Sequence, residues 1–117
     1  LDHLAALGFR GISCFGPRLK PQIGDDLWVV NTHVDLVNWR GGRQFIGESA
    51  AISALVEHLR GRREGRFDLA EPTGILSHHL VHGSDCFSFI ERLLRTLDDH
   101  PAASWLSPEK VFQLRWR

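Results

Sequence analysis

Two kinds of hydrophobic pattern alternate along the 117-residue chain, and this alternation constrains the fold more than any other feature. Short runs of β-branched and apolar residues are typical of buried strands, whereas apolar residues recurring every three or four positions mark one face of a helix. Glycine and proline separate these segments. Alternation of strands with helices favours a parallel sheet with helices packed against it. We therefore expect an α/β fold.

The expected strands are 9–15, 27–34, 73–80 and 103–106, and the expected helices are 1–7, 49–63, one from Ser84 to His100-Pro101, and one beginning at Ser107. Ser84 and Ser107 are the expected N-caps. The two long helices are expected to pack through the stripes Ile52, Leu55, Val56 and Leu59, and Phe87, Ile90, Leu93, Leu94 and Leu97.

Domain organisation is predicted to be simple, with residues 1–117 forming part of one domain. Leu1, Leu4 and Leu7 are already at helical spacing, which indicates that the chain begins inside a longer pattern. We expect the N-terminal part of the same domain to precede it.

Charge and composition exclude some classes of partner. Lys plus Arg and Asp plus Glu are equal at 14 each, so no net field attracts nucleic acid or an anionic membrane. No apolar run approaches the roughly 20 residues of a membrane span, and no signal peptide is visible. The location is not determined by these features, and the cytoplasm is slightly favoured. Cys14 and Cys86 lie in apolar surroundings and are expected to be buried free thiols.

Two places along the chain, an arginine cluster and Arg18, could bind an anion, but a solvent-exposed role is favoured for both. Four arginines cluster near the end of a predicted helix: Arg60, Arg62, Arg63 and Arg66. A solvated helix end explains this cluster better than a phosphate site does. Arg18 is expected to be a surface residue.

Functional sites in parallel α/β folds form at the carboxyl ends of strands. That rule selects the segments 13–18, 33–43 and 77–83. Segment 77–83 contains His78, His79 and His82. One of these could be a general acid or base, or a metal ligand, because imidazole titrates near neutral pH. The alternative is a set of hydrogen-bonded loop histidines, since the spacing is not a recognised zinc motif.

Segment 33–43 places the carboxylate of Asp35 four residues before Trp39. Sugar rings stack on such aromatic surfaces while polar neighbours bind their hydroxyl groups. The alternative is structural: an ion pair between Asp35 and an arginine, with Trp39 buried in the core.

Several of these residues together resemble the polysaccharide deacetylase (NodB-like) superfamily. Its late Leu-x-His motif corresponds to Leu76-Ser77-His78, and its Asp-x-x-Asp-Trp motif to Asp35-Leu36-Val37-Asn38-Trp39. The wider segments 9–18, 30–43 and 74–82 also look like a bacterial branch of this family. The resemblance spans nearly the whole chain and implies the C-terminal part of a distorted (β/α) barrel.

The resemblance also implies a function, hydrolysis of N-acetyl or similar acyl groups on an amino sugar or polysaccharide. His78 would be the general acid that protonates the leaving amine, and Leu76 would line the acyl pocket. Asp35 and Trp39 would bind substrate, with Asn38, Arg40 and His33 supporting the site. The family uses a divalent metal such as zinc, held by an Asp and two His in segments that precede this region. No complete metal site is expected within this chain.

One departure from the family pattern concerns Asn38, where the motif has an acid. An amide at this position weakens the tuning of a neighbouring charge. Two other functions stay open: a non-catalytic carbohydrate-binding relative, and an unrelated α/β domain with a structural metal at His78, His79 and His82.

Overall fold

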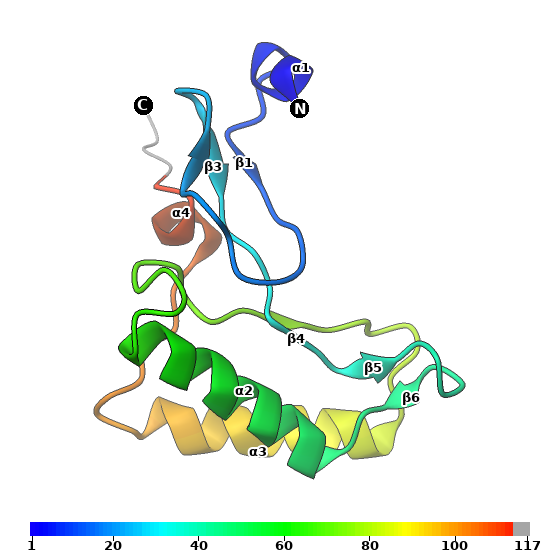
Figure 1. Ribbon diagram of the computed structural model, residues 1–117. Coiled ribbons are helices and arrows are strands. Elements are labelled where there is room, and N and C mark those ends of the chain that lie inside the picture. The colour runs from blue at the N-terminus through cyan, green and yellow to red at the C-terminus, as the bar shows by residue number, and fades with distance from the viewer. Residues whose placement is uncertain (114–117) are drawn as a thin grey trace.

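The structure, a computed structural model, describes residues 1–113 apart from the side chain of Asp2 (Figure 1). The helices are α1 (Asp2–Ala6), α2 (Glu48–Arg63), α3 (Ser84–Asp98) and α4 (Pro108–Val111), and the strands are β1 (Gly11–Ile12), β2 (Gln22–Ile23), β3 (Leu27–Val29), β4 (Val34–Asp35), β5 (Val37–Asn38), β6 (Gln44–Phe45) and β7 (Ile75–Leu76). Within residues 1–113 the strands form three small sheets, in the orders β1-β3-β2, β4-β7 and β5-β6. The chain therefore has an α/β structure.

One extended segment, residues 27–36, contains both β3 and β4 and pairs in turn with two parallel neighbours, while β2 pairs antiparallel with the other edge of β3. β1 is parallel to β3, and β7 is parallel to β4. The segment changes partner between Thr32, whose N–H donates to Cys14, and His33, whose N–H donates to Gly74. The predicted strands 9–15, 27–34 and 73–80 thus adjoin in parallel as expected, but regular pairing is confined to short stretches of each.

Helices α2 and α3 lie on one side of the strands β4, β5 and β6 (Figure 1). A single hydrophobic cluster joins the strands to both helices, and an ion pair between Glu48 and Arg92 links the helices directly. The buried residues of this cluster are Val34, Leu36, Ala51, Leu55, Cys86 and Phe89. At the other end of the molecule, the ring of Phe112 after α4 lies against β1. It approaches Gly11 so closely that a Cβ at this position would come within 2.3 Å of the ring.

Both long helices bury a face that overlaps the predicted stripe only in part. In α2 the buried residues are Ala51, Leu55, His58 and Gly61, while Ile52, Val56 and Leu59 are exposed. In α3 the buried residues are Cys86 and Phe89, and the predicted Ile90 and Leu93 are partly buried against the core cluster. The predicted Phe87 and Leu94 are exposed. The predicted stripes were thus right at Leu55, Ile90 and Leu93 and wrong at the exposed positions. They weighed hydrophobicity alone, whereas close packing selects the small residues Ala51 and Gly61 for the inner face of α2.

Four further expectations are corrected. The strand expected at 73–80 ends at Leu76, because the chain turns where the N–H of Val81 donates to the carbonyl of His78. Residues 103–106 form no strand, and Trp105 and Leu106 are half exposed. Gly83, not Ser84, is the N-cap of α3, and Cys14 is exposed rather than buried.

Two other expectations, the cap at Ser107 and the buried thiol of Cys86, are confirmed. The side chain of Ser107 accepts from the N–H of Lys110 and caps α4, with Pro108 as the first helical residue. Cys86 is a buried free thiol, and burial raises its pKa. None of the helices within the described residues is both long and apolar enough to cross a bilayer.

The two phenylalanines of α3 test which helix face is buried. Phe89 is 2% exposed and Phe87 is 49% exposed. We expect Phe89→Ala to lower the free energy of unfolding by about 3–5 kcal/mol, because it leaves a cavity in the core. The matched variant Phe87→Ala is expected to change it by about 0.5 kcal/mol or less. Urea unfolding followed by circular dichroism measures both, and equal losses would show that the helix face is misassigned.

Candidate functional site

The ends of β4 and β7 bring Asp35 and His78 together. The parallel register places Val34 opposite Ile75 and Asp35 opposite Leu76, so both strands end at the same edge. Nε2 of His78 lies 3.0 Å from Oδ1 of Asp35, although the two residues are 43 positions apart in the sequence. The side chains are 26% and 22% exposed, so this pair lies at the surface of the molecule.

Trp39 completes the arrangement. Trp39 directly follows β5 in the turn of the β5–β6 hairpin, and its indole N–H donates to Oδ2 of Asp35 at 2.9 Å. The ring meets that of His78 edge to face, with centroids 4.8 Å apart, and Trp39 is 50% exposed. The structural alternative for this segment was wrong, since Trp39 is not buried and Asp35 pairs with a histidine instead of an arginine.

The hydrogen-bond pattern determines which nitrogen of His78 is available for chemistry. An ionised carboxylate only accepts, so Nε2 of His78 carries a proton and donates it to Asp35. Within residues 1–113 no hydrogen bond engages Nδ1 of His78, which is therefore the atom that can exchange a proton with a ligand. The bond to the Asp35 carboxylate holds the ring in this orientation.

The remaining residues named by the resemblance have other positions. Leu76 is half-buried opposite Asp35 in the register of the two strands. Oδ1 of Asn38 accepts the N–H groups of Arg40 and Gly41, at 3.2 and 3.0 Å, and so closes the hairpin turn. A carboxylate at this position could accept the same two bonds. Both bonds come from backbone N–H groups, so these contacts do not show the expected tuning of a neighbouring charge. Arg40 is exposed on the hairpin.

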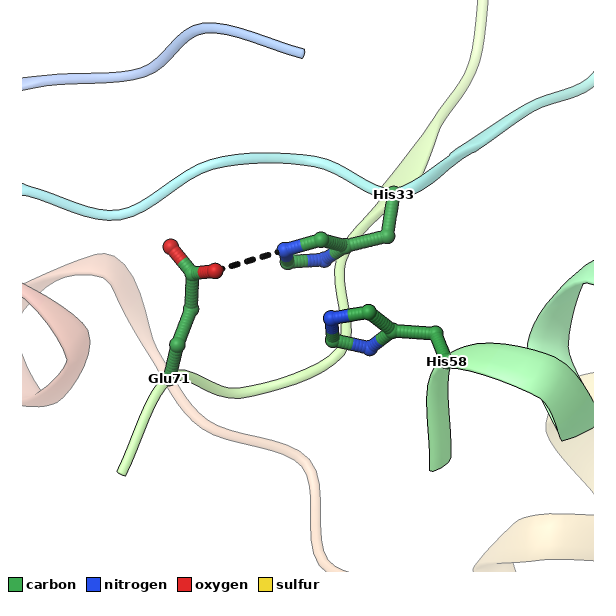
Figure 2. Close-up of side chains that lie close together, drawn as sticks. All are labelled: His33, His58 and Glu71. Atoms are coloured by element: carbon green, nitrogen blue, oxygen red, sulfur yellow. Dashed lines mark hydrogen bonds and ion pairs between the residues drawn. The ribbon is translucent and has the colours of Figure 1, made fainter. Parts of the chain in front are cut away.

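His33 belongs to a second, buried cluster with Glu71 and His58 (Figure 2). Nε2 of His33 lies 2.8 Å from Oε1 of Glu71, and both side chains are 1% exposed. The carboxylate also accepts the backbone N–H groups of Arg18 and Asn31, each at 3.0 Å. Glu71 thereby joins the loop after β1, the central segment and the approach to β7. Sequence reasoning missed it, because a single acid in a polar connection carries no distinguishing pattern.

Arg18 supports this cluster and is not the surface residue that was expected. Its guanidinium side chain is 6% exposed and donates to Oδ2 of Asp68 at 2.8 Å and to the carbonyl of Val29. It also lies 3.9 Å from Glu71. In the arginine cluster at the end of α2, Arg60 and Arg66 are solvated as predicted, whereas Arg62 turns inward and donates to Thr73.

His58 stacks on His33, with ring centroids 3.6 Å apart, and is 5% exposed. Its Nδ1 lies 2.9 Å from the hydroxyl of Thr73, while its Nε2 is buried without a partner. Burial, with smaller effects of His33 and Arg62, lowers the pKa of His58 to about 4. A signal for this residue existed, since His58 follows Leu55 by three positions on the inner face of α2.

The resemblance implies a divalent metal, and one group of the described residues has the composition of a metal site. His33, His58 and Glu71 have ligand atoms within 4.8 Å of one another and are the group of this kind that residues 1–113 contain. However, Nδ1 of His33 accepts the N–H of Gly74 at 2.9 Å, so its proton is on Nε2, the atom facing Glu71. An imidazole that binds a metal needs a free electron pair on the ligating nitrogen and carries its proton on the other nitrogen. The cluster therefore fits a hydrogen-bonded network and does not fit a metal site.

The histidines of segment 77–83 do not form a metal group either. His78 and His82 are four positions apart, but Nε2 of His82 accepts the backbone N–H of His78 at 2.8 Å, and the ring centroids are 6.4 Å apart. His79 is exposed. The structural metal considered for these three residues finds no support in this geometry.

Comparison of the chain with protein-family models, curated proteins and solved structures finds no match.

The buried His58 predicts a pH-dependent stability. Its pKa is about 4 in the folded chain and about 6.5 unfolded, so between these values only the unfolded chain binds the proton. Stability is complete above the unfolded value and falls on acidification, by about 2 kcal/mol from pH 7 to pH 5.

The variant His58→Asn keeps an acceptor for Thr73 but does not titrate, so it is expected to lose this part of the pH dependence. His79→Asn, at an exposed histidine, is the matched control and is expected to retain it. Urea unfolding at both pH values measures the effect, and an unchanged slope for His58→Asn would contradict the assignment.

Proposed function

We propose that the chain contributes the general acid and a sugar-binding surface to a hydrolase that removes N-acetyl or similar acyl groups from an amino sugar or polysaccharide. One observation carries the proposal: Asp35, Trp39 and His78 are in mutual contact at the ends of β4 and β7. These are residues that the sequence resemblance had named for catalysis and substrate binding.

The acid step uses the free nitrogen of His78. When an amide is hydrolysed, the oxygen of water bonds to the acyl carbon, the carbon–nitrogen bond breaks and the leaving nitrogen must gain a proton. Nδ1 of protonated His78 would donate that proton as the bond breaks. The ring would then be neutral with its remaining proton on Nε2, where the bond to Asp35 keeps it in position.

Substrate binding is assigned to Trp39 and Leu76. The exposed indole offers an apolar face on which a sugar ring can stack, and Asp35 fixes its orientation through the indole N–H. Leu76 would contribute apolar surface for the acyl methyl group.

A divalent metal would polarise the acyl carbonyl and activate the attacking water in such an enzyme. The described residues do not fit that metal, so the proposal assigns its ligands and the catalytic base to the N-terminal part of the same domain. The distorted (β/α) barrel is part of the same proposal. Three adjoining parallel segments support it: β1, the segment that contains β3 and β4, and β7. The outer two, β1 and β7, each have one strand partner among the described residues.

The test compares His78→Gln with His79→Gln in the zinc-loaded protein that contains this chain and its preceding segment. Acetate release from an N-acetylated amino-sugar oligomer is measured. We expect His78→Gln to lower kcat by about 10²- to 10⁴-fold with little change in KM, because only proton transfer is lost. His79→Gln, an exposed neighbour, should match the wild type. Wild-type turnover by His78→Gln would refute the acid role.

A non-catalytic carbohydrate-binding protein is the second candidate, favoured by the half-exposed ring of Trp39. Trp39→Ala and Trp105→Ala form a matched pair, because both tryptophans are 50% exposed. In a fluorescence titration of the chain with the same oligomer, Trp39→Ala is expected to weaken binding about tenfold or more, given the contribution of one buried aromatic contact. Trp105→Ala should bind normally. Equal affinities in both variants would exclude Trp39 as the sugar-binding surface.

A further inference from the structure

The backbone that carries His78 is not held by strand pairing. β7 ends at Leu76, and Ser77, His79 and Leu80 are exposed. The turn that follows is closed by the N–H of Val81 donating to the carbonyl of His78 at 2.9 Å. This bond holds only the carbonyl of His78, and the N–H of His78, which belongs to the preceding peptide unit, requires a second restraint.

His82 provides that restraint. Its Nε2 accepts the backbone N–H of His78 at 2.8 Å, so both polar groups of the His78 backbone are engaged within the turn. The ring of His82 is half-buried and meets Phe87 of α3 edge to face, with centroids 5.7 Å apart. The restraint is thus anchored on a helix and does not depend on the turn alone.

We propose that His82 is a positioning residue, which holds the His78 backbone through Nε2 so that the His78 ring reaches the Asp35 carboxylate. The catalytic consequence rests on the proposed function, whereas the contact and its effect on His78 do not. Only a neutral ring with its proton on Nδ1 can accept at Nε2. A doubly protonated His82 has no acceptor and must release the His78 N–H.

The surroundings of His82 keep it in the accepting form near neutral pH. Burial, followed by repulsion from His78 and His79, lowers the pKa of His82, and Asp35 and Asp85 oppose this effect. The restraint is therefore present at neutral pH and is lost in acid, once His82 binds its second proton.

Nuclear magnetic resonance of the ¹⁵N-labelled chain tests the proposal without requiring catalysis. Long-range ¹H–¹⁵N correlations should show the His82 proton on Nδ1 and, as an internal reference, the His33 proton on Nε2. In His82→Phe, which keeps a ring but has no acceptor, exchange of the His78 amide should accelerate about tenfold or more, the effect of losing one hydrogen bond. The Nε2–H signal of His78 should also be lost to exchange with water.

His82→Gln, whose carbonyl oxygen can replace Nε2, should restore both signals, and His79→Phe should leave them unchanged. Should His82→Phe fail to fold, acid titration of the wild-type chain gives the same information, because protection of the His78 amide must disappear as His82 binds its second proton.

Unchanged amide exchange in His82→Phe, or protection that persists when His82 is doubly protonated, would overturn the proposal by showing that the bond is absent. Faster exchange with an unchanged Nε2–H signal would overturn it by showing that His82 holds the backbone but not the ring. Each of these outcomes is independent of turnover by His78→Gln, so failure of the proposed function remains distinguishable.

Discussion

The buried carboxylate of Glu71 is the interaction on which the rest of the structure depends. A carboxylate that is 1% exposed is costly unless it is paired and fully hydrogen-bonded. Glu71 meets this requirement by accepting from His33, from the N–H of Arg18 and from the N–H of Asn31. These partners belong to the loop after β1 and to the central segment, and Glu71 itself precedes β7. One side chain therefore holds together the segments that the small sheets pair only briefly.

The same network sets the register that forms the candidate site. His33 engages Gly74 twice, because its N–H donates to the Gly74 carbonyl and its Nδ1 accepts the Gly74 N–H. A side chain at position 74 would be 2.8 Å from the carbonyl oxygen of Asn31, so only glycine allows this approach. With Gly74 held in place, β7 pairs with β4 so that Leu76 lies opposite Asp35 and His78 follows at the edge.

The 117-residue chain thus contains two histidine–carboxylate pairs with different roles in the structure. The His33–Glu71 pair is buried, and every nitrogen and oxygen in it is already used in the hydrogen-bonded framework. The His78–Asp35 pair is partly exposed and leaves Nδ1 of His78 without a hydrogen bond among the described residues. The same chemical groups thus stabilise the fold in one place and leave a nitrogen open to a ligand in the other. Burial and the remaining free atom decide between these roles.

Sequence by itself determined the segments that contain β1, β3, β4 and β7, the bounds of α2 and α3 to within a residue or two, and the cap at Ser107, because these depend on local periodicity and on single capping residues. It also selected Asp35, Trp39 and His78 through short motifs. Tertiary structure decided which helix faces are buried, where β7 ends, and that Arg18, His58 and Glu71 are internal. Those outcomes depend on contacts between segments 40 or 53 positions apart, such as Asn31 with Glu71 and Arg18 with Glu71, which no local pattern encodes.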